Sequence, residues 1–519
     1  MPASELRRAL PDLRVSSDAA DRVAYARDLW PRHHLAVRAG NVGEHRPGAI
    51  AWPETTLEVQ SIVRWANDSG TPLVPFGAGS GVCAGILPDE DVVVVDLKRM
   101  SRWRLFDPRA PLLDVEAGHM GVPLEEGLNR RGFTLGHFPS SILCSTVGGW
   151  VAARSAGQCS GYYGKIEDMV CQVECVTGRG DIVTLARRLH GPDLVPIVVG
   201  SEGTLAIVTS ATMRLHPAPQ SRAFGAWSFP TTEHGWEAIR ALFQAGLRPA
   251  VSRLYDPFDA MLARQGSIKK DKGRHEPAPP GVGHAALRRV LMHPSALNEL
   301  IELSSGLLGG SLLVVIFEGS GERPQRDIEE ARLLLEAMRG TYEGEGPARK
   351  WFQHRYSVSY RQAPIFAAGA WVDTMEVAAP WSKLGELYRS VRAALSKHAF
   401  VMAHFSHAYP DGCCIYFSFA GSAHKSSLDW DRACEATYDR AWPAALDAAI
   451  AAGGTLSHHH GVGRSKAPRL GAELGAGIDV VRALQRAFDP NRVLNPGNLV
   501  APPTPEPYVD DAHEKEVFP

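Results

Sequence analysis

The sequence predicts an α+β protein that is built from two domains. A strand–helix–strand pattern with a glycine-rich loop occupies residues 45–100, and a glycine turn at 200–203 opens a further strand. Beyond Pro217-Ala-Pro219 the pattern changes to alternating strands and helices. A chain of 519 residues is long enough to hold two domains with substantial cores.

The composition is that of an ordinary globular protein, with 45% hydrophobic and 22% charged residues. A net charge of −2 argues against a nucleic-acid-binding function. The N-terminal residues lack the apolar core of a secretory signal, and no stretch approaches the ~18 apolar residues of a membrane helix. The eight scattered cysteines include no CxxC pair that would indicate zinc. We therefore expect a cytoplasmic protein with reduced thiols.

The first elements are predicted from capping residues and apolar spacing. Residues 1–44 form a helical lead-in that Trp30-Pro31 should end. A helix should begin after Thr55, which can cap it while Glu58 reciprocates in a capping box. Its apolar face would consist of Val59, Ile62, Val63 and Ala66, and residues 68–70 should stop it.

Residues 71–85, TPLVPFGAGSGVCAG, follow this helix and precede a strongly β-type run at 92–96. Closely spaced glycines allow positive φ and aim successive N–H groups into one concavity, which suits phosphate oxygens. A Rossmann fingerprint would require a crossover helix, for which Pro88 and the acidic residues 89–91 leave no room. The alternative is a glycine turn without a ligand.

Residues 139–164 are dense in Ser, Thr, Gly and Ala and nearly free of charge, Arg154 excepted. Such a segment is either a tightly packed structural loop or a wall against a flat cofactor. A hairpin at 172–177 and 181–185 follows it, and a strand at 212–216 closes this half.

The second half predicts a large antiparallel sheet with helices on one face. Its strands are expected at 224–229, 251–255 and 312–318, and its helices at 233–245 and 324–339. Residues 265–284 are polar, basic and rich in Pro and Gly, which is typical of a mobile loop.

The densest ionisable cluster is the run His458, His459 and His460 in SHHHGVG. Imidazoles suit proton transfer near neutral pH, so this run is a candidate acid–base group. A metal site is the rival interpretation, with His404 or His407 as a further ligand. A purely structural role is the third.

Two further side chains stand out within strand-like runs. Tyr416 could present its phenol to a pocket or be a core tyrosine. Arg253 is a charge inside an apolar run and therefore requires an anion, either Asp256 or a substrate. Arg361 is a weaker candidate of the same kind.

Six stretches together resemble one family: STVGGWVAARSAG, YGKIEDMV, GSEGTLAIVTSATMRLHPAP, SRLYD, CCIYF and LSHHHGVG. They are similar to FAD-linked oxidases with the vanillyl-alcohol-oxidase, or PCMH-type, flavin domain, and within that family most to the alkyldihydroxyacetone-phosphate synthases. The resemblance covers residues 45–500. It implies a PCMH-type FAD-binding domain of two α/β subdomains at 45–217 and an antiparallel-sheet cap domain with flanking helices at 218–450. Residues 451–501 would close the FAD site with the histidine loop, and 502–519 would form a tail.

The resemblance also implies which residues bind FAD. Ser80 stands where covalent members carry a flavin-linking histidine, so we expect noncovalent FAD, although Cys144 lies near the place of a cysteinyl link in bicovalent members. The implied cofactor-binding residues are Pro75, Phe76, Gly77, Ala78, Gly79, Ser80, Gly81, Ser140, Ser141, Cys144, Ser145, Thr146, Gly149, Arg154, Ser155, Glu202, Gly203 and Ile207.

By the same resemblance, Tyr416 and the three histidines would be catalytic beside flavin N5, and Arg253 and Arg361 would bind an anionic substrate. In the synthases, the acyl group of acyl-dihydroxyacetone phosphate is exchanged for a fatty alcohol without net redox. The related D-lactate and glycolate dehydrogenases instead oxidise a D-2-hydroxyacid, and oxidation of another alcohol is a further alternative. Those dehydrogenases carry a metal-binding histidine pair, but His407 has no clear partner where Cys414-Ile415-Tyr416 stands, so we expect no metal. Tyr416 and the triple histidine favour the synthase side.

The resemblance leaves other partners open. We expect a small-molecule substrate, a homodimer, and peripheral membrane contact if the substrate is a lipid. A flavin-fold protein that only binds a ligand is the non-enzymatic alternative.

Overall fold

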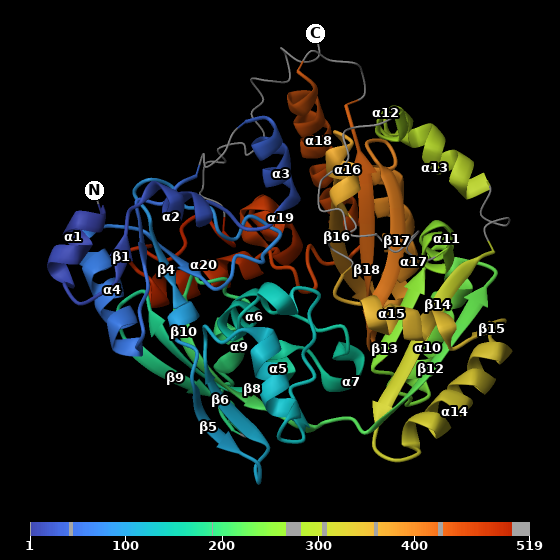
Figure 1. Cartoon of the computed structure of the whole chain (residues 1–519), viewed down its shortest axis with the longest axis horizontal. Coiled ribbons are helices and arrows are strands. Elements are labelled where there is room, and N and C mark those ends of the chain that lie inside the picture. The colour runs from blue at the N-terminus through green and yellow to red at the C-terminus, as the bar shows by residue number, and fades with distance from the viewer. Residues whose placement is uncertain are drawn as a thin grey trace.

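The computed structural model describes residues 2–40, 45–188, 190–265, 282–303, 309–357, 362–423 and 429–500. The first half of the chain contains a four-stranded and a five-stranded sheet, and the second half contains a seven-stranded sheet. In Figure 1 the blue-to-green first half lies on the left and the large sheet of the second half on the right. The predicted α+β class is confirmed.

The four-stranded sheet carries the glycine loop. Its order is β1-β2-β4-β3, with β2 and β3 both parallel to β4. Residues 77–92, between β3 and β4, contain no helix, so the Rossmann alternative is excluded as predicted. The bounds are β1 (Val15–Ser16), β2 (Ala49–Ala51), β3 (Leu73–Phe76) and β4 (Val93–Asp96).

Helix α4 (Thr56–Ser69) connects β2 to β3 and buries the predicted apolar face. The Thr55 hydroxyl accepts the Glu58 N–H at 3.2 Å, which confirms the cap. The Glu58 carboxylate, however, accepts the N–H of Glu54 at 2.6 Å, one residue before the position that a capping box requires. Gly70 ends the helix at φ 68°, where the absence of a Cβ removes the strain of the left-handed conformation.

The N-terminal prediction was wrong in one respect. In the part of the chain before β2 that the structure describes, residues 2–40 and 45–48, there are three short helices, α1 (Pro2–Ala9), α2 (Ala19–Ala24) and α3 (Pro31–Arg38). Pro31 begins α3 instead of ending a helix, because the first helical position needs no backbone N–H.

The five-stranded sheet has the order β5-β6-β10-β8-β9 and is antiparallel throughout. The small-residue segment forms short helices beside this sheet. The bounds in this half are β5 (Trp103–Asp107), β6 (Leu112–Glu116), α5 (Gly121–Asn129), β7 (Phe133–Thr134), α6 (Val147–Ala153), α7 (Ser160–Tyr163), α8 (Ile166–Met169), β8 (Val170–Thr177), β9 (Ile182–Ala186), α9 (Val195–Val198), β10 (Ala206–Arg214) and β11 (His216–Pro217).

The seven-stranded sheet has the order β15-β12-β14-β13-β17-β18-β16, and all its pairings are antiparallel. Its strands are β12 (Ser221–Phe229), β13 (Val251–Tyr255), β14 (Ser311–Gly319), β15 (Thr341–Gly344), β16 (Trp371–Pro380), β17 (Phe400–Ala408) and β18 (Gly412–Gly421). Its helices are α10 (Thr232–Gln244), α11 (Pro257–Gln265), α12 (Val282–Leu291), α13 (Pro294–Leu303), α14 (Arg323–Ala337), α15 (Gly346–His354), α16 (Ala363–Ala367) and α17 (Trp381–Leu395).

Both faces of this sheet are buried. On β14, Leu313, Val315 and Phe317 belong to the core cluster under α10, α14 and α17. The alternate residues Leu312, Val314 and Ile316 belong to the core of the first half. Helices therefore cover one face as predicted, while the other face packs against the first half of the chain and also carries α15.

The C-terminal segment returns to the first half after α18 (Trp430–Ala451), α19 (Gly463–Leu474) and α20 (Gly477–Phe488). Figure 1 shows the red helices α19 and α20 beside the blue strands. Leu73 donates its N–H to Val493 and accepts from Asn495, both at 2.7 Å. Among the described helices, none combines the length and apolar character needed to cross a membrane. Most of the predicted loop at 265–284, and the tail from 502, lie outside the described residues.

Candidate active site

Four side chains form a row across the sheet face that packs on the first half. Glu376 on β16 lies opposite Tyr416 on β18, Tyr416 opposite His404 on β17, and His404 opposite Tyr255 on β13. Directly opposed residues on neighbouring strands project to the same face. Strand register therefore brings Tyr416 together with two ionisable side chains, Glu376 and His404.

The carboxylate of Glu376 holds in place the turn that carries residues 458–460, which we call the histidine turn. It accepts the backbone N–H groups of His458 at 2.5 Å and His460 at 2.8 Å, and the Ser457 hydroxyl at 2.5 Å. Glu376 is fully buried, so each accepted hydrogen bond replaces lost water. The turn that carries the three imidazoles is thus fixed to the sheet by one side chain.

Lys466 on α19 supplies the counter-charge. Its ammonium is fully buried, lies 3.7 Å from the Glu376 carboxylate, and has no hydrogen-bond partner among the described residues. Burial alone would raise the pKa of Glu376, but Lys466 and the nearby His460 bring that pKa below its ordinary value. Burial opposes the charge of Lys466 in the same way, yet nearby acidic groups, Cys83 and Glu376 first, raise its pKa. The pair is therefore charged.

Tyr416 is bonded to two imidazoles. Its hydroxyl lies 2.5 Å from Nε2 of His459 and 3.2 Å from Nε2 of His407. Burial raises the pKa of Tyr416 well above 10, and burial with neighbouring imidazoles lowers the pKa values of His407 and His459 well below 6.5. Burial likewise lowers the pKa values of His458 and His460 to about 4. These groups are therefore neutral near pH 7.

Arg253 points into the same face from β13. Its Nη2 donates to Nε2 of His404 at 2.8 Å, and Nδ1 of His404 lies 3.4 Å from an Asp259 carboxylate oxygen. The expected alternative partner, Asp256, instead pairs with Arg392 at 3.3 Å. The Nε of Arg253 is buried and lacks a hydrogen-bond acceptor in the described part of the chain, so it can donate to a bound anion. Arg361 lies outside the described residues.

The glycine loop meets two other predicted flavin-binding stretches. A Cβ on Gly77 would lie 2.4 Å from Oγ1 of Thr146, and one on Gly203 would lie 3.0 Å from Pro75. Gly79 has φ 68°. Within the described ranges, no N–H of residues 77–81 donates a hydrogen bond to the protein. A loop of free amides with no room for side chains fits a diphosphate such as that of FAD.

Several predicted cofactor residues have side chains that are engaged within the protein. The Ser145 hydroxyl accepts from Trp150 at 2.8 Å, and Thr146 caps α6 through Gly149 N–H at 3.3 Å. Ser155 bonds to His137, Arg154 is exposed and ion-paired with Glu167, and Ile207 is fully buried in the core. These positions can offer FAD mainly backbone or packing contacts.

Glu202 connects the flavin-side turn to the histidine turn. Its carboxylate accepts the N–H groups of Val462 at 2.5 Å and Gly463 at 2.8 Å, at the start of α19. A carboxylate at a helix N-terminus is stabilised by the unsatisfied N–H groups and the helix dipole. The predicted cofactor turn and the predicted catalytic turn are therefore held as one unit.

One cluster has the composition of a metal site. Ligand atoms of Glu376, Cys414, His458 and His459 lie within 4.8 Å of one another. The Glu376 oxygens already accept hydrogen bonds from the histidine turn, and the Lys466 ammonium lies 3.7 Å away. This carboxylate serves as an anchor for the turn, and we assign the cluster no metal.

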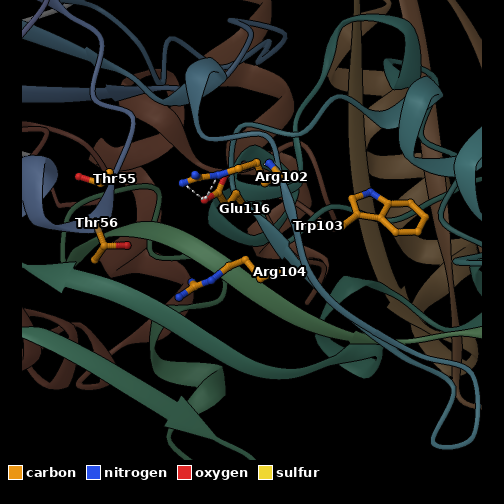
Figure 2. Close-up of a pocket in the computed structure, with 6 residues that line it drawn as sticks. All are labelled: Thr55, Thr56, Arg102, Trp103, Arg104 and Glu116. Carbon is orange, nitrogen blue, oxygen red and sulfur yellow. Dashed lines mark hydrogen bonds and ion pairs between the residues drawn. The ribbon is translucent and has the colours of Figure 1, made fainter.

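A surface cavity of about 410 Å³ lies away from these residues. Figure 2 shows Thr55, Thr56, Arg102, Trp103, Arg104 and Glu116 around it, with Arg102 directed at Glu116. Arg102 bonds to Glu116 at 2.9 Å and Arg104 to Glu174 at 2.8 Å, so both cations are already paired. None of the acid–base residues lines it.

The first half, with three sheets and a loop of free amides, is joined to a seven-stranded sheet that bears histidines, an arrangement that fits a cofactor-dependent enzyme. Residues 47–186 match the family model described as "FAD binding domain", and residues 218–499 match "FAD linked oxidases, C-terminal domain". The chain belongs to the FAD-linked oxidase family, and the resemblance drawn from its motifs is confirmed.

The named relatives include enzymes with different activities. The chain is 30% identical over 526 residues to an alkyldihydroxyacetonephosphate synthase of Dictyostelium discoideum, covering 98% of this chain and 81% of that protein. It is 24% identical over 490 residues to the glycolate oxidase subunit GlcD of Bacillus subtilis, covering 93% of each. A solved alkyldihydroxyacetonephosphate synthase structure matches with a TM-score of 0.74 and 28% identity, covering 95% of this chain and 85% of that one.

Replacing Gly77 by Ala should weaken FAD binding. The new Cβ would lie 2.4 Å from Oγ1 of Thr146, and such overpacking costs about 1–3 kcal/mol. We expect the Kd for FAD to rise about 10- to 100-fold, measured by flavin fluorescence during titration into apoprotein. The control is Gly346→Ala, where no atom lies within 4 Å of the added carbon. Equal affinities of the G77A variant and the unaltered protein would contradict the phosphate-loop assignment.

Proposed function

We propose that this chain is an FAD-dependent enzyme of the alkyldihydroxyacetone-phosphate synthase type. It would exchange the acyl group of an acyl-dihydroxyacetone phosphate for a fatty alcohol. The observation that carries the proposal is the Tyr416 phenol, which is held by His459 Nε2 at 2.5 Å on the sheet face that also presents Arg253. Full-length similarity to synthases at about 30% identity supports the same reading.

Each residue has a defined task in this reaction. FAD, when bound, supplies the electrophilic flavin N5. Arg253, whose Nε has no acceptor in the described structure, binds the substrate phosphate. The incoming alcohol hydroxyl loses its proton to Nε2 of His458, which has no hydrogen-bond partner in the described structure, and His459 and Tyr416 follow along the same line of hydrogen bonds. Glu376 holds the histidine turn in place through His458 and His460.

We further propose that FAD is bound noncovalently. Ser80 offers no imidazole for a link to the flavin. Burial raises the pKa of Cys144, so its sulfur is the protonated thiol, which is a poor nucleophile. Colour that is lost with the small molecules after denaturation and filtration supports this proposal, whereas colour retained on the polypeptide would contradict it.

Oxidation of a D-2-hydroxyacid is the second candidate. It is favoured by Arg253, which could bind a carboxylate as well as a phosphate, together with a neutral imidazole that could take the hydroxyl proton. Similarity to the glycolate oxidase subunit supports it at lower identity.

Anaerobic mixing of the FAD-loaded protein with each substrate separates the two candidates. Acyl-dihydroxyacetone phosphate plus a fatty alcohol should release fatty acid with no electron acceptor consumed. Bleaching by D-lactate or glycolate that an acceptor reverses would instead establish the dehydrogenase. If neither substrate changes the flavin spectrum, both proposals fail.

A further inference from the structure

A continuous line of hydrogen bonds leads from the histidine turn through Ser160 of the first half to Tyr409. Successive distances are 2.9, 2.5, 3.2, 2.8 and 3.1 Å. The first distance joins Nδ1 of His458 to Nδ1 of His459, and the second joins Nε2 of His459 to the Tyr416 hydroxyl. The third joins that hydroxyl to Nε2 of His407, and the fourth joins Nδ1 of His407 to Oγ of Ser160. The last joins Oγ of Ser160 to the Tyr409 hydroxyl. Among the described residues, the interior side chains of the line have no further hydrogen-bond partner.

Counting protons shows that the line has only two arrangements. A neutral imidazole has one N–H and one lone pair, and a hydroxyl donates one hydrogen. The Tyr416 hydroxyl can donate to Nε2 of His459 or of His407, and the other Nε2 must then donate to its oxygen. The choice made at Tyr416 then fixes which atom donates and which accepts in every neighbouring hydrogen bond. All hydrogen bonds therefore point either toward His458 or toward Tyr409.

We propose that this line is a proton relay that carries a proton between the active site and solvent through His407, Ser160 and Tyr409. When a proton binds Nε2 of His458, its Nδ1–H passes to His459, whose Nε2–H passes to Tyr416. The Tyr416 proton moves to His407, the His407 Nδ1–H to Ser160, the Ser160 proton to Tyr409, and the Tyr409 proton to water. One proton enters, one leaves, and no group stays charged. The reverse passage delivers a proton to the site.

The two ends of the line have the properties that a relay needs. Nε2 of His458 is buried and has no hydrogen-bond partner among the described residues, so it is open to a bound substrate. Tyr409, at the other end, is only partly buried. The Lys165 ammonium lies 5.7 Å from the centre of its ring. The line thus ends on two residues, His458 and Tyr409, that are both only partly buried.

His407 reaches the line because of a backbone irregularity. The pairing of β17 with β18 shifts between Ser406 and Ala408, which leaves His407 as the extra residue of a β-bulge. Its φ is 53°, a conformation that costs free energy in any residue other than glycine. In an unbroken strand, residue 407 would face the helices that cover Phe405 and Ala403. The bulge instead turns its ring to Tyr416 and Ser160.

The charge state of the line agrees with this role. Burial, with neighbouring cations and imidazoles, lowers the pKa of His407 and of His459 well below 6.5. Burial raises the pKa values of Tyr416 and Tyr409 above 10. Each member is thus neutral at physiological pH, as transfer through hydrogen-bonded neutral groups requires. Ser160 belongs to α7 in the flavin-side half, so the relay crosses between the two halves.

The first test needs no turnover. In FAD-loaded protein labelled with 15N at histidine, His407→Gln and His459→Gln variants assign the two rings. The relay requires that one of the two Nε2 atoms carries hydrogen and the other does not, with both rings neutral between pH 6 and 9. Two protonated Nε2 atoms, two bare ones, or an imidazolium would overturn it.

The second test interrupts the line and rests on the proposed function. Ser160→Ala removes the link between His407 and Tyr409, while Ser311→Ala removes another buried serine hydroxyl, which bonds Thr232 at 2.9 Å, away from the line. Single-turnover mixing with a pH-indicator dye should show proton release slowed about 10-fold or more in S160A only. Release at an unaltered rate in S160A would overturn the relay. If no substrate changes the flavin spectrum, the proposed function fails, and the histidine protonation pattern still decides the relay.

Discussion

Tyr416→Phe should lower kcat by about 100- to 10,000-fold, the usual contribution of a positioned acid–base group, while FAD stays bound. The substitution removes only the hydroxyl that lies 2.5 Å from His459 and 3.2 Å from His407. The ring still stacks on His404, with ring centroids 4.6 Å apart, so the fold should be kept. Steady-state rates with the substrate identified by anaerobic mixing would measure the effect.

The matched control is Tyr342→Phe, on β15 at the opposite edge of the same sheet. It should leave kcat unaltered. His459→Ala should reproduce the loss seen with Y416F, because the two groups act on the same proton. An unaltered rate in Y416F, with FAD bound, would remove the phenol from the mechanism.

Glu376→Gln should destabilise the protein by about 3–5 kcal/mol, because it leaves the buried Lys466 ammonium without its counter-charge. Lys466→Met should cost a similar amount by leaving the Glu376 carboxylate unpaired. The double variant E376Q/K466M should recover part of this loss, since neither charge is then buried alone. Equilibrium unfolding in urea measures all three.

An exposed ion pair provides the control for this cycle. Glu237 and Arg240 lie three residues apart on α10 with a third of each side chain exposed, so Glu237→Gln should cost at most about 1 kcal/mol. Two results would contradict the role of the Glu376–Lys466 pair as the anchor of the histidine turn. One is that E376Q lowers the free energy of unfolding no more than E237Q does. The other is that the losses in free energy of unfolding of E376Q and K466M simply add in the double variant.

Sequence patterns predicted many helices and strands well, because a helix cap or an apolar face depends on residues that are close together in the sequence. The cap at Thr55 and the apolar face of α4 follow from spacing, and β13 has the predicted bounds of residues 251–255. Pro31 was misread because a proline both ends one helix and begins the next with the same local signal.

The site was predicted only in part, because its geometry depends on strand register between distant segments. Tyr416 and the histidines were identified by type, but the row that joins Glu376, Tyr416 and His404 follows from long-range pairing. Glu376 carried a usable signal, since it is a charge inside the apolar run 371–380, as Arg253 is in its own strand. The bulge that redirects His407 has no comparable signal in the sequence.

The return of the chain end to the glycine loop sets the order of assembly during synthesis. Leu73 is bonded to Val493 and Asn495, and the Asn495 amide also bonds Gly85 and Glu202. A ribosome that has translated the whole first half has therefore not yet produced the segment that fastens the phosphate loop. The phosphate loop can have these contacts only after residues 493–495 have been synthesised.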